Sequence, residues 1–109
     1  MVTMLPIELD GRTCISVDVM LPKTHLIAIQ AHSGYIMCGA LDVNLLNTRL
    51  HSRNIIAGRA VGVRTVEELL NAPLEAITDA AASLGITKGM TGKDALCIMY
   101  DLTSPWEQG

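Results

Sequence analysis

The sequence is poor in aromatic side chains and in charge. Its 109 residues include no Phe, one Trp and two Tyr, and only 17% of them are charged. Stacking of aromatic side chains on nucleic-acid bases is therefore not expected. The formal net charge of −3 at pH 7 also argues against a nucleic-acid partner, because a phosphate backbone is bound by a basic surface.

The sequence also lacks the patterns typical of membrane, secreted and cofactor-binding proteins. It has no run of about 18 apolar residues, the length that spans a bilayer. Its start, MVTMLPIELDGR, has neither the basic nor the apolar region of a signal peptide. Phosphate-binding motifs such as G-x-G-x-x-G and the P-loop are missing. We therefore expect a cytoplasmic protein that has no membrane partner and no cofactor.

The three cysteines do not form a metal or disulfide pattern. The chain has an odd number of cysteines, Cys14, Cys38 and Cys97. They lie far apart in the sequence, and no two of them form a C-x-x-C pair. His25 and His32 stand at spacings from Cys38 that match no zinc motif. No metal site is predicted.

Apolar residues, in contrast, are abundant. They make up 50% of the chain, and the mean hydropathy is +0.36. A single domain of this length, residues 1–109, buries roughly 65% of the surface that its unfolded chain exposes. The apolar excess is typical of a chain that buries further surface against copies of itself, so we expect a homo-oligomer.

Period-two alternation and turn residues predict a mostly antiparallel β region over about 4–41. The clearest strand is CISVDVML, in which Ile15, Val17, Val19 and Leu21 share one face. The run LIAIQA is apolar on both faces and predicts a central strand that is covered on both sides. Asp10-Gly11 is a turn pair, and residues 25–41 are expected to form a hairpin.

The second half of the chain predicts one more strand and four helices. The strand lies near 55–63 and contains Gly58 and Gly62, whose missing side chains admit another backbone or a ligand. Capping residues and helical spacing predict helices near 43–53, 66–71, 73–84 and 92–102, and a frayed tail over 103–109. Strands first and helices later favour an α+β fold.

Cys38 is the candidate catalytic residue. It stands at the end of a predicted strand, just before Gly39 and a helix that we expect Asp42 to cap, and backbone N–H groups at a helix start lower a thiol pKa. A cysteine hydrolase or transferase also needs a base such as His25, His32 or His51. The alternative is a small buried side chain without chemistry, which is the commoner environment of a free cysteine.

Four arginines form the candidate ligand-binding cluster. Arg49, Arg53, Arg59 and Arg64 are half of all the Lys and Arg residues. Arg64 directly precedes a helix predicted to start after Thr65, where free N–H groups favour an anion. A small carboxylate or phosphate near Arg59 and Arg64, with Gly39 and Asp42 close by, is one interpretation. The other is that these arginines pair with acidic residues such as Asp42, Glu67 and Glu68.

Three separated blocks resemble a known family. GYIMCGALDVNLLN, AGRAVGVRTVEELLNAPLE and LGITKGMTGKDAL occur in the order found in the YunC-like proteins, a bacterial and archaeal family of unknown function. The resemblance covers roughly residues 1–102. It implies an α/β domain whose N-terminal β region forms a tetramer, here through the strands between about Met4 and Ala31. It assigns no reaction, so the site residues above rest on chemistry alone. A scaffold for a partner protein remains a further alternative.

Overall fold

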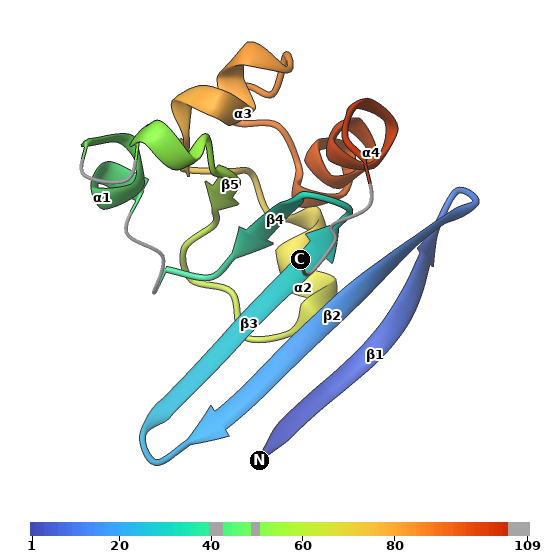
Figure 1. Ribbon diagram of the computed structural model, residues 1–109. Coiled ribbons are helices and arrows are strands. Elements are labelled where there is room, and N and C mark those ends of the chain that lie inside the picture. The colour runs from blue at the N-terminus through green and yellow to red at the C-terminus, as the bar shows by residue number, and fades with distance from the viewer. Residues whose placement is uncertain (40–42, 49–50, 105–109) are drawn as a thin grey trace.

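The computed structural model describes residues 1–39, 43–48 and 51–104, which form a six-stranded sheet packed by helices (Figure 1). The strands neighbour one another in chain order: β1 (Val2–Leu9), β2 (Arg12–Leu21), β3 (Thr24–Ala31), β4 (Gly34–Met37), β5 (Ile56–Arg59) and β6 (Ala76–Ile77). The helical segments are α1 (Val43–Thr48), the 3-10 turn η1 (His51–Arg53), α2 (Val66–Asn71), α3 (Asp79–Ser83) and α4 (Gly92–Leu102). The predicted α+β class is confirmed. Within the described ranges, no helix has the length and apolar character needed to cross a bilayer.

The antiparallel N-terminal region is confirmed. β1 pairs with β2, β2 with β3 and β3 with β4, all antiparallel. Asp10 and Gly11 join the first two strands with φ angles of 53° and 83°. Left-handed backbone at both positions fits the right-handed twist of a hairpin, which is why Asp-Gly predicts this turn.

The pairing of β4 with β5 is parallel, which the sequence pattern did not predict. The chain reaches β5 from β4 through α1 and η1. β5 ends at Arg59 instead of continuing to position 63, and beyond it Gly62 has a φ of +76°, a left-handed backbone that does not fit an extended strand. Ala60 still donates its N–H to the Met37 carbonyl at 3.0 Å, so the ends of the two strands lie side by side.

The prediction of a helix over 73–84 is wrong for the first half of this range. Leu74 donates its N–H to the Met90 carbonyl, and Ala76 and Ile77 pair with β5 as the short strand β6. α3 begins only after Thr78, whose hydroxyl accepts the N–H of Ala81. The apolar positions do have helical spacing, but the open edge of β5 supplies backbone partners and Thr78 supplies a helix start.

α2 and α4 cover one face of the sheet. Their side chains Leu69 and Leu96 join Ile27, Ile29 and Ile36 of the strands in the main core, and all five are fully buried. The two helices approach closely at Gly92, where an added Cβ would lie 2.2 Å from the Leu69 carbonyl oxygen. The core therefore sits between this face and the two helices.

The opposite face is covered only in part. Val43 and Leu46 of α1 pack on Ala57 of β5, with Tyr35 and Met37 of β4 beside them. β2 alternates as predicted, but Cys14 and Ser16 are its buried residues, while Ile15 and Val17 are only half-buried. On β3 as well, Ala28 and Gln30 are half-buried, so within one chain this strand is covered on one side.

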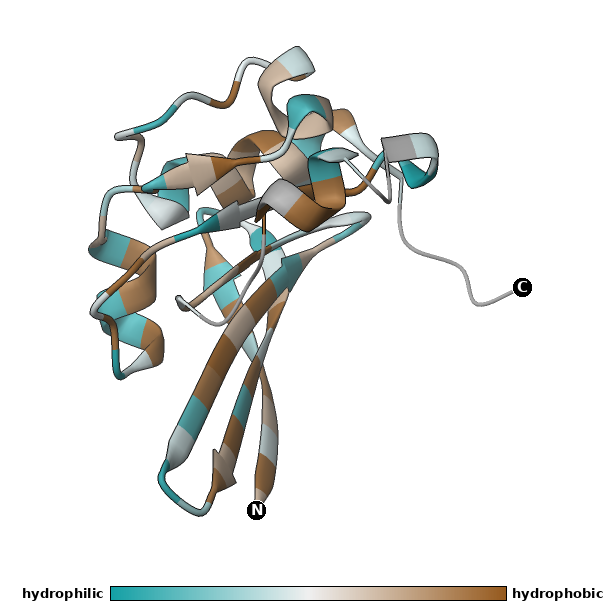
Figure 2. Ribbon diagram, turned by 90° about the vertical axis from the view of Figure 1, so that its left-hand side faces the viewer, coloured by the Kyte–Doolittle hydropathy of each residue, from teal (hydrophilic) through white to brown (hydrophobic). Residues whose placement is uncertain are grey.

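The outer part of β1–β3 extends beyond the helices (Figures 1 and 2). We call residues 1–6 and 17–26 the β arm, and the rest of the described residues the body. None of the residues of the β arm is buried. Of the nine exposed large hydrophobic residues in the described ranges, six belong to it: Met1, Val2, Met4, Leu5, Met20 and Leu21.

Candidate functional site

Cys38 and Gly39 lie at the carboxyl end of β4, next to the carboxyl end of its parallel neighbour β5. The Cys38 N–H donates to the Ile27 carbonyl at 3.0 Å. A Cβ added to Gly39 would lie 3.6 Å from Val61, which follows β5. The carboxyl ends of parallel strands are a common place for ligand binding in α/β proteins, and this setting was hidden because the parallel pairing was not predicted.

Cys38 is buried, and only 6% of the residue is exposed. The two histidines whose side chains are described are engaged elsewhere. His25 pairs with Asp18, and His32 approaches the Thr103 carbonyl through Nδ1 and stacks on Tyr100 at 3.8 Å. Neither of them serves Cys38 as a base in this arrangement. Asp42 lies outside the described residues.

Cys14 does not have the environment of a reactive thiol. Cys14 is fully buried, and this burial, with a smaller effect of neighbouring Cys97, raises the pKa of its thiol. The protonated thiol is a poor nucleophile and a poor metal ligand. Across residues 1–39, 43–48 and 51–104, no three His, Cys, Asp or Glu side chains gather as a metal site would require.

Arg59 is held by an acidic neighbour. Its Nε donates to Glu75 Oε2 at 2.8 Å, and Nη2 lies 2.8 Å from the same oxygen. The backbone joins the same two residues, because the Glu75 N–H donates to the Arg59 carbonyl at 2.7 Å. This arrangement matches the alternative in which the arginines pair with acidic residues. The partner, Glu75, was not among the predicted ones.

Arg64 lies at the start of α2, as predicted, and its side chain is exposed. Its backbone N–H donates to the Glu68 carboxylate at 2.8 Å, while the Thr65 hydroxyl accepts the Glu68 N–H at 3.1 Å. The chain's own acceptors thus satisfy these backbone donors. Arg53 is exposed on η1, and Arg49 lies outside the described residues.

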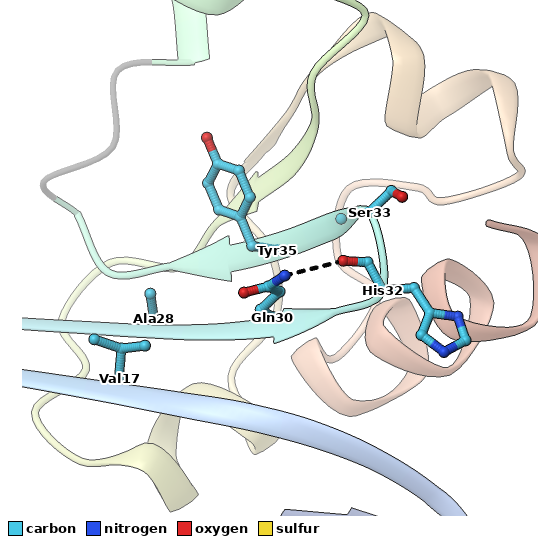
Figure 3. A pocket seen from close by; sticks show the side chains of 7 residues that line it. Val17, Ala28, Gln30, His32, Ser33 and Tyr35 are labelled. Atoms are coloured by element: carbon cyan, nitrogen blue, oxygen red, sulfur yellow. Dashed lines mark hydrogen bonds between the residues drawn. The ribbon is translucent and has the colours of Figure 1, made fainter. Parts of the chain in front are cut away.

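Sequence reasoning missed a pocket on the partly covered face of the sheet (Figure 3). Its volume is about 360 Å³, and it is lined by Val17, Ala28, Gln30, His32, Ser33, Gly34 and Tyr35. Two signals were present: Gln30 is the one polar side chain inside the apolar run LIAIQA, and Tyr35 is one of only two tyrosines. Which face they share, and that this face is open, required the tertiary structure.

Comparison with known proteins places the chain among proteins without an assigned activity. The uncharacterized protein YunC of Bacillus subtilis (strain 168) is 56% identical over 99 residues, a match that covers 91% of this chain and 98% of the relative. A crystal structure of a protein of unknown function, TA1206 from Thermoplasma acidophilum, has a TM-score of 0.79 at 27% identity, and the match covers 89% of this chain and 91% of that one.

A family model supports the same assignment. The model of the domain of unknown function DUF1805 matches residues 37–99, which run from the end of β4 into α4. The resemblance to YunC-like proteins is confirmed by this match and by the Bacillus relative. The chain belongs to the DUF1805 family of unknown function.

Proposed function

We propose that this chain acts as a self-assembling domain, and that the β arm is the surface through which four copies associate. The observation that carries the proposal is the concentration of exposed apolar side chains in residues 1–6 and 17–26. Burying one Val, Leu or Met side chain contributes roughly 1.5–3 kcal/mol. An exposed apolar surface of this kind, next to a separately packed core, is typical of a subunit interface.

Both faces of the β arm are apolar, which favours a tetramer over a dimer. Val2 and Met4 share one face with Val19 and Val17, their partners in the β1–β2 ladder. Met20 lies on the other face, because it alternates with Val19 along β2. Two different self-complementary surfaces on one subunit generate a closed tetramer, since each surface makes its own twofold contact.

The test is the mass of the assembly in solution, measured by light scattering during size-exclusion chromatography. Wild type should be a tetramer, and Met4→Lys and Met20→Lys should each stop at a dimer, because each places a charge in one of the two contacts. The double variant should be a monomer. Leu102→Lys is the matched control: Leu102 is 59% exposed, close to the 63% of Met4, but lies on α4. A monomeric wild type, or an unchanged double variant, would refute the proposal.

Two other hypotheses that came from the sequence stay predictions. A small anion at Arg59 and Arg64 would have to compete with Glu75 for the Arg59 side chain and with Glu68 for the Arg64 N–H. A cysteine-dependent reaction at Cys38 would need a base from a residue other than His25 or His32. The cytoplasmic location is likewise a proposal, supported by three cysteines that are all free thiols.

A further inference from the structure

We propose that copies which meet at Met4 do so edge to edge, through antiparallel pairing of β1 with β1 of a second copy. The inference rests on the proposed assembly and names the strand that joins two of its subunits. β1 is the outermost strand of the sheet, and among the described residues no strand pairs with its free edge (Figure 1). Residues 1–6 are all exposed. The free edge is therefore accessible along the whole first part of β1.

The hydrogen bonds between β1 and β2 show which backbone groups of β1 point outward. The Met1 amino group donates to the Met20 carbonyl at 2.8 Å, and the Met20 N–H donates to the Met1 carbonyl at 2.8 Å. In an antiparallel ladder, such doubly bonded pairs alternate with pairs that exchange no hydrogen bonds. Val2 and Met4 therefore belong to the pairs without hydrogen bonds. Their N–H and carbonyl groups point to the free edge.

The position of Pro6 agrees with this direction and limits the length that can pair. Pro6 stands at the next outward position after Met4, where its missing N–H breaks no hydrogen bond to β2. A strand laid along the free edge would, however, find no donor at this residue. The stretch that remains is residues 1–5, which carries no charged side chain that would protect the edge from pairing.

One twofold register pairs every outward backbone group of residues 1–5. When Val2 lies opposite Met4 of the second copy, Met4 lies opposite Val2 of that copy, because a twofold axis makes each contact reciprocal. Each of these two pairs exchanges both of its hydrogen bonds. Thr3 then faces Thr3 of the second copy across the axis. The Val2 and Met4 side chains of both copies gather on one face, which supplies the apolar part of the contact.

Disulfide cross-linking tests the register, in the Met20→Lys background where only the contact at Met4 should remain. Oxidation of Thr3→Cys should convert the chain to a covalent dimer, because opposed residues without mutual hydrogen bonds have Cα atoms about 4.5 Å apart, within the span of a disulfide. Val2→Cys is the matched control, since its two copies are diagonal neighbours roughly 7–8 Å apart and should not cross-link. Non-reducing electrophoresis measures both, with the Met20→Lys chain as the blank for the native thiols. Equal or weaker cross-linking of Thr3→Cys would overturn the proposal.

A second test removes the outward N–H itself. In light scattering, Met4→Pro should have half the mass of the wild-type tetramer, because proline has no N–H to donate to Val2 of the second copy. Glu8→Pro removes an outward N–H from the same edge but beyond the paired residues, so it should remain a tetramer. Circular dichroism establishes that both variants keep the β structure. A tetrameric Met4→Pro would overturn the edge pairing while the proposed assembly stood, whereas a monomeric wild type would refute both.

Discussion

The β arm and the body are parts of one sheet that have opposite relations to solvent. In the body, Ile27, Ile29 and Ile36 are fully buried under α2 and α4. In the β arm, Val2 and Met4 are 61% and 63% exposed although their side chains are also apolar. An apolar side chain therefore favours burial, but the positions of the helices within one chain decide which apolar side chains are buried. The uncovered part is the surface through which we propose that the copies associate.

The largest effect on stability is expected for a substitution in the core of the body. Leu96→Ala on α4 should lower the free energy of unfolding by about 2–5 kcal/mol, because it leaves a cavity in a fully buried core. Leu102→Ala on the same helix, where the side chain is 59% exposed, should change it by about 0.5 kcal/mol or less. Urea denaturation of both variants measures the difference. Equal losses would contradict the division of α4 into a buried and a solvent-facing side.

A smaller effect is expected at the edge of the body. Thr78 is 2% exposed, and its hydroxyl accepts the N–H of Ala57 at 3.1 Å and that of Ala81 at 3.2 Å. Thr78→Val keeps the shape but leaves both donors without this partner, so we expect a loss of roughly 1–3 kcal/mol. Thr65→Val removes an equivalent but exposed cap from α2 and should cost about 1 kcal/mol or less. Thermal unfolding compares them, and a larger loss at Thr65 would refute the role of burial.

The smallest effect on stability is expected at the ion pair that links β2 to α4. Arg12 donates from Nε and Nη2 to the two oxygens of Asp101 at 2.8 and 2.7 Å, and this hydrogen bonding lowers the pKa of Asp101. A lowered pKa in the folded state stabilises the fold above the unfolded pKa, and this contribution is lost as the pH falls through the folded pKa. Asp101→Asn should therefore be slightly less stable than wild type at pH 7.

The pH dependence distinguishes this pair from ordinary surface polarity. In urea denaturation, the difference between wild type and Asp101→Asn should shrink toward zero as the pH falls through the lowered pKa of Asp101. In the Arg12→Gln background, the same substitution should have little effect at pH 7, because the partner is already gone. A difference that stays constant from neutral to acid pH would show that the ion pair contributes nothing.

Local patterns predicted the elements that depend on neighbours in the sequence. Asp10-Gly11 makes the first turn, and Thr65 and Glu68 form the predicted cap of α2, which runs over the predicted 66–71. The same reasoning predicted a helix from Pro73, because it could not foresee that the edge of β5 would pair with Ala76 and Ile77. Strand pairing between distant segments has no local signal, so both β6 and the parallel β4–β5 pair were missed.

The candidate site was predicted less completely than the fold. The sequence indicated that Cys38 ends a strand and that Arg64 precedes a helix, and both positions are as expected. It could not show that Arg59 pairs with Glu75, or that Gln30 and Tyr35 share an open face, because side-chain partners depend on which elements come together.

The sequence by itself determined the composition of the fold: an apolar, weakly charged chain that forms an antiparallel β region followed by capped helices. The period-two alternation along β2 was equally clear. It did not show which face of the strand is buried, because both faces carry apolar residues. Only the tertiary structure decided that Cys14 and Ser16 turn toward α4 and the core while Ile15 and Val17 remain half-buried on the open face. The physical reason is that alternation fixes which side chains share a face, whereas the packing of distant helices decides which face is buried.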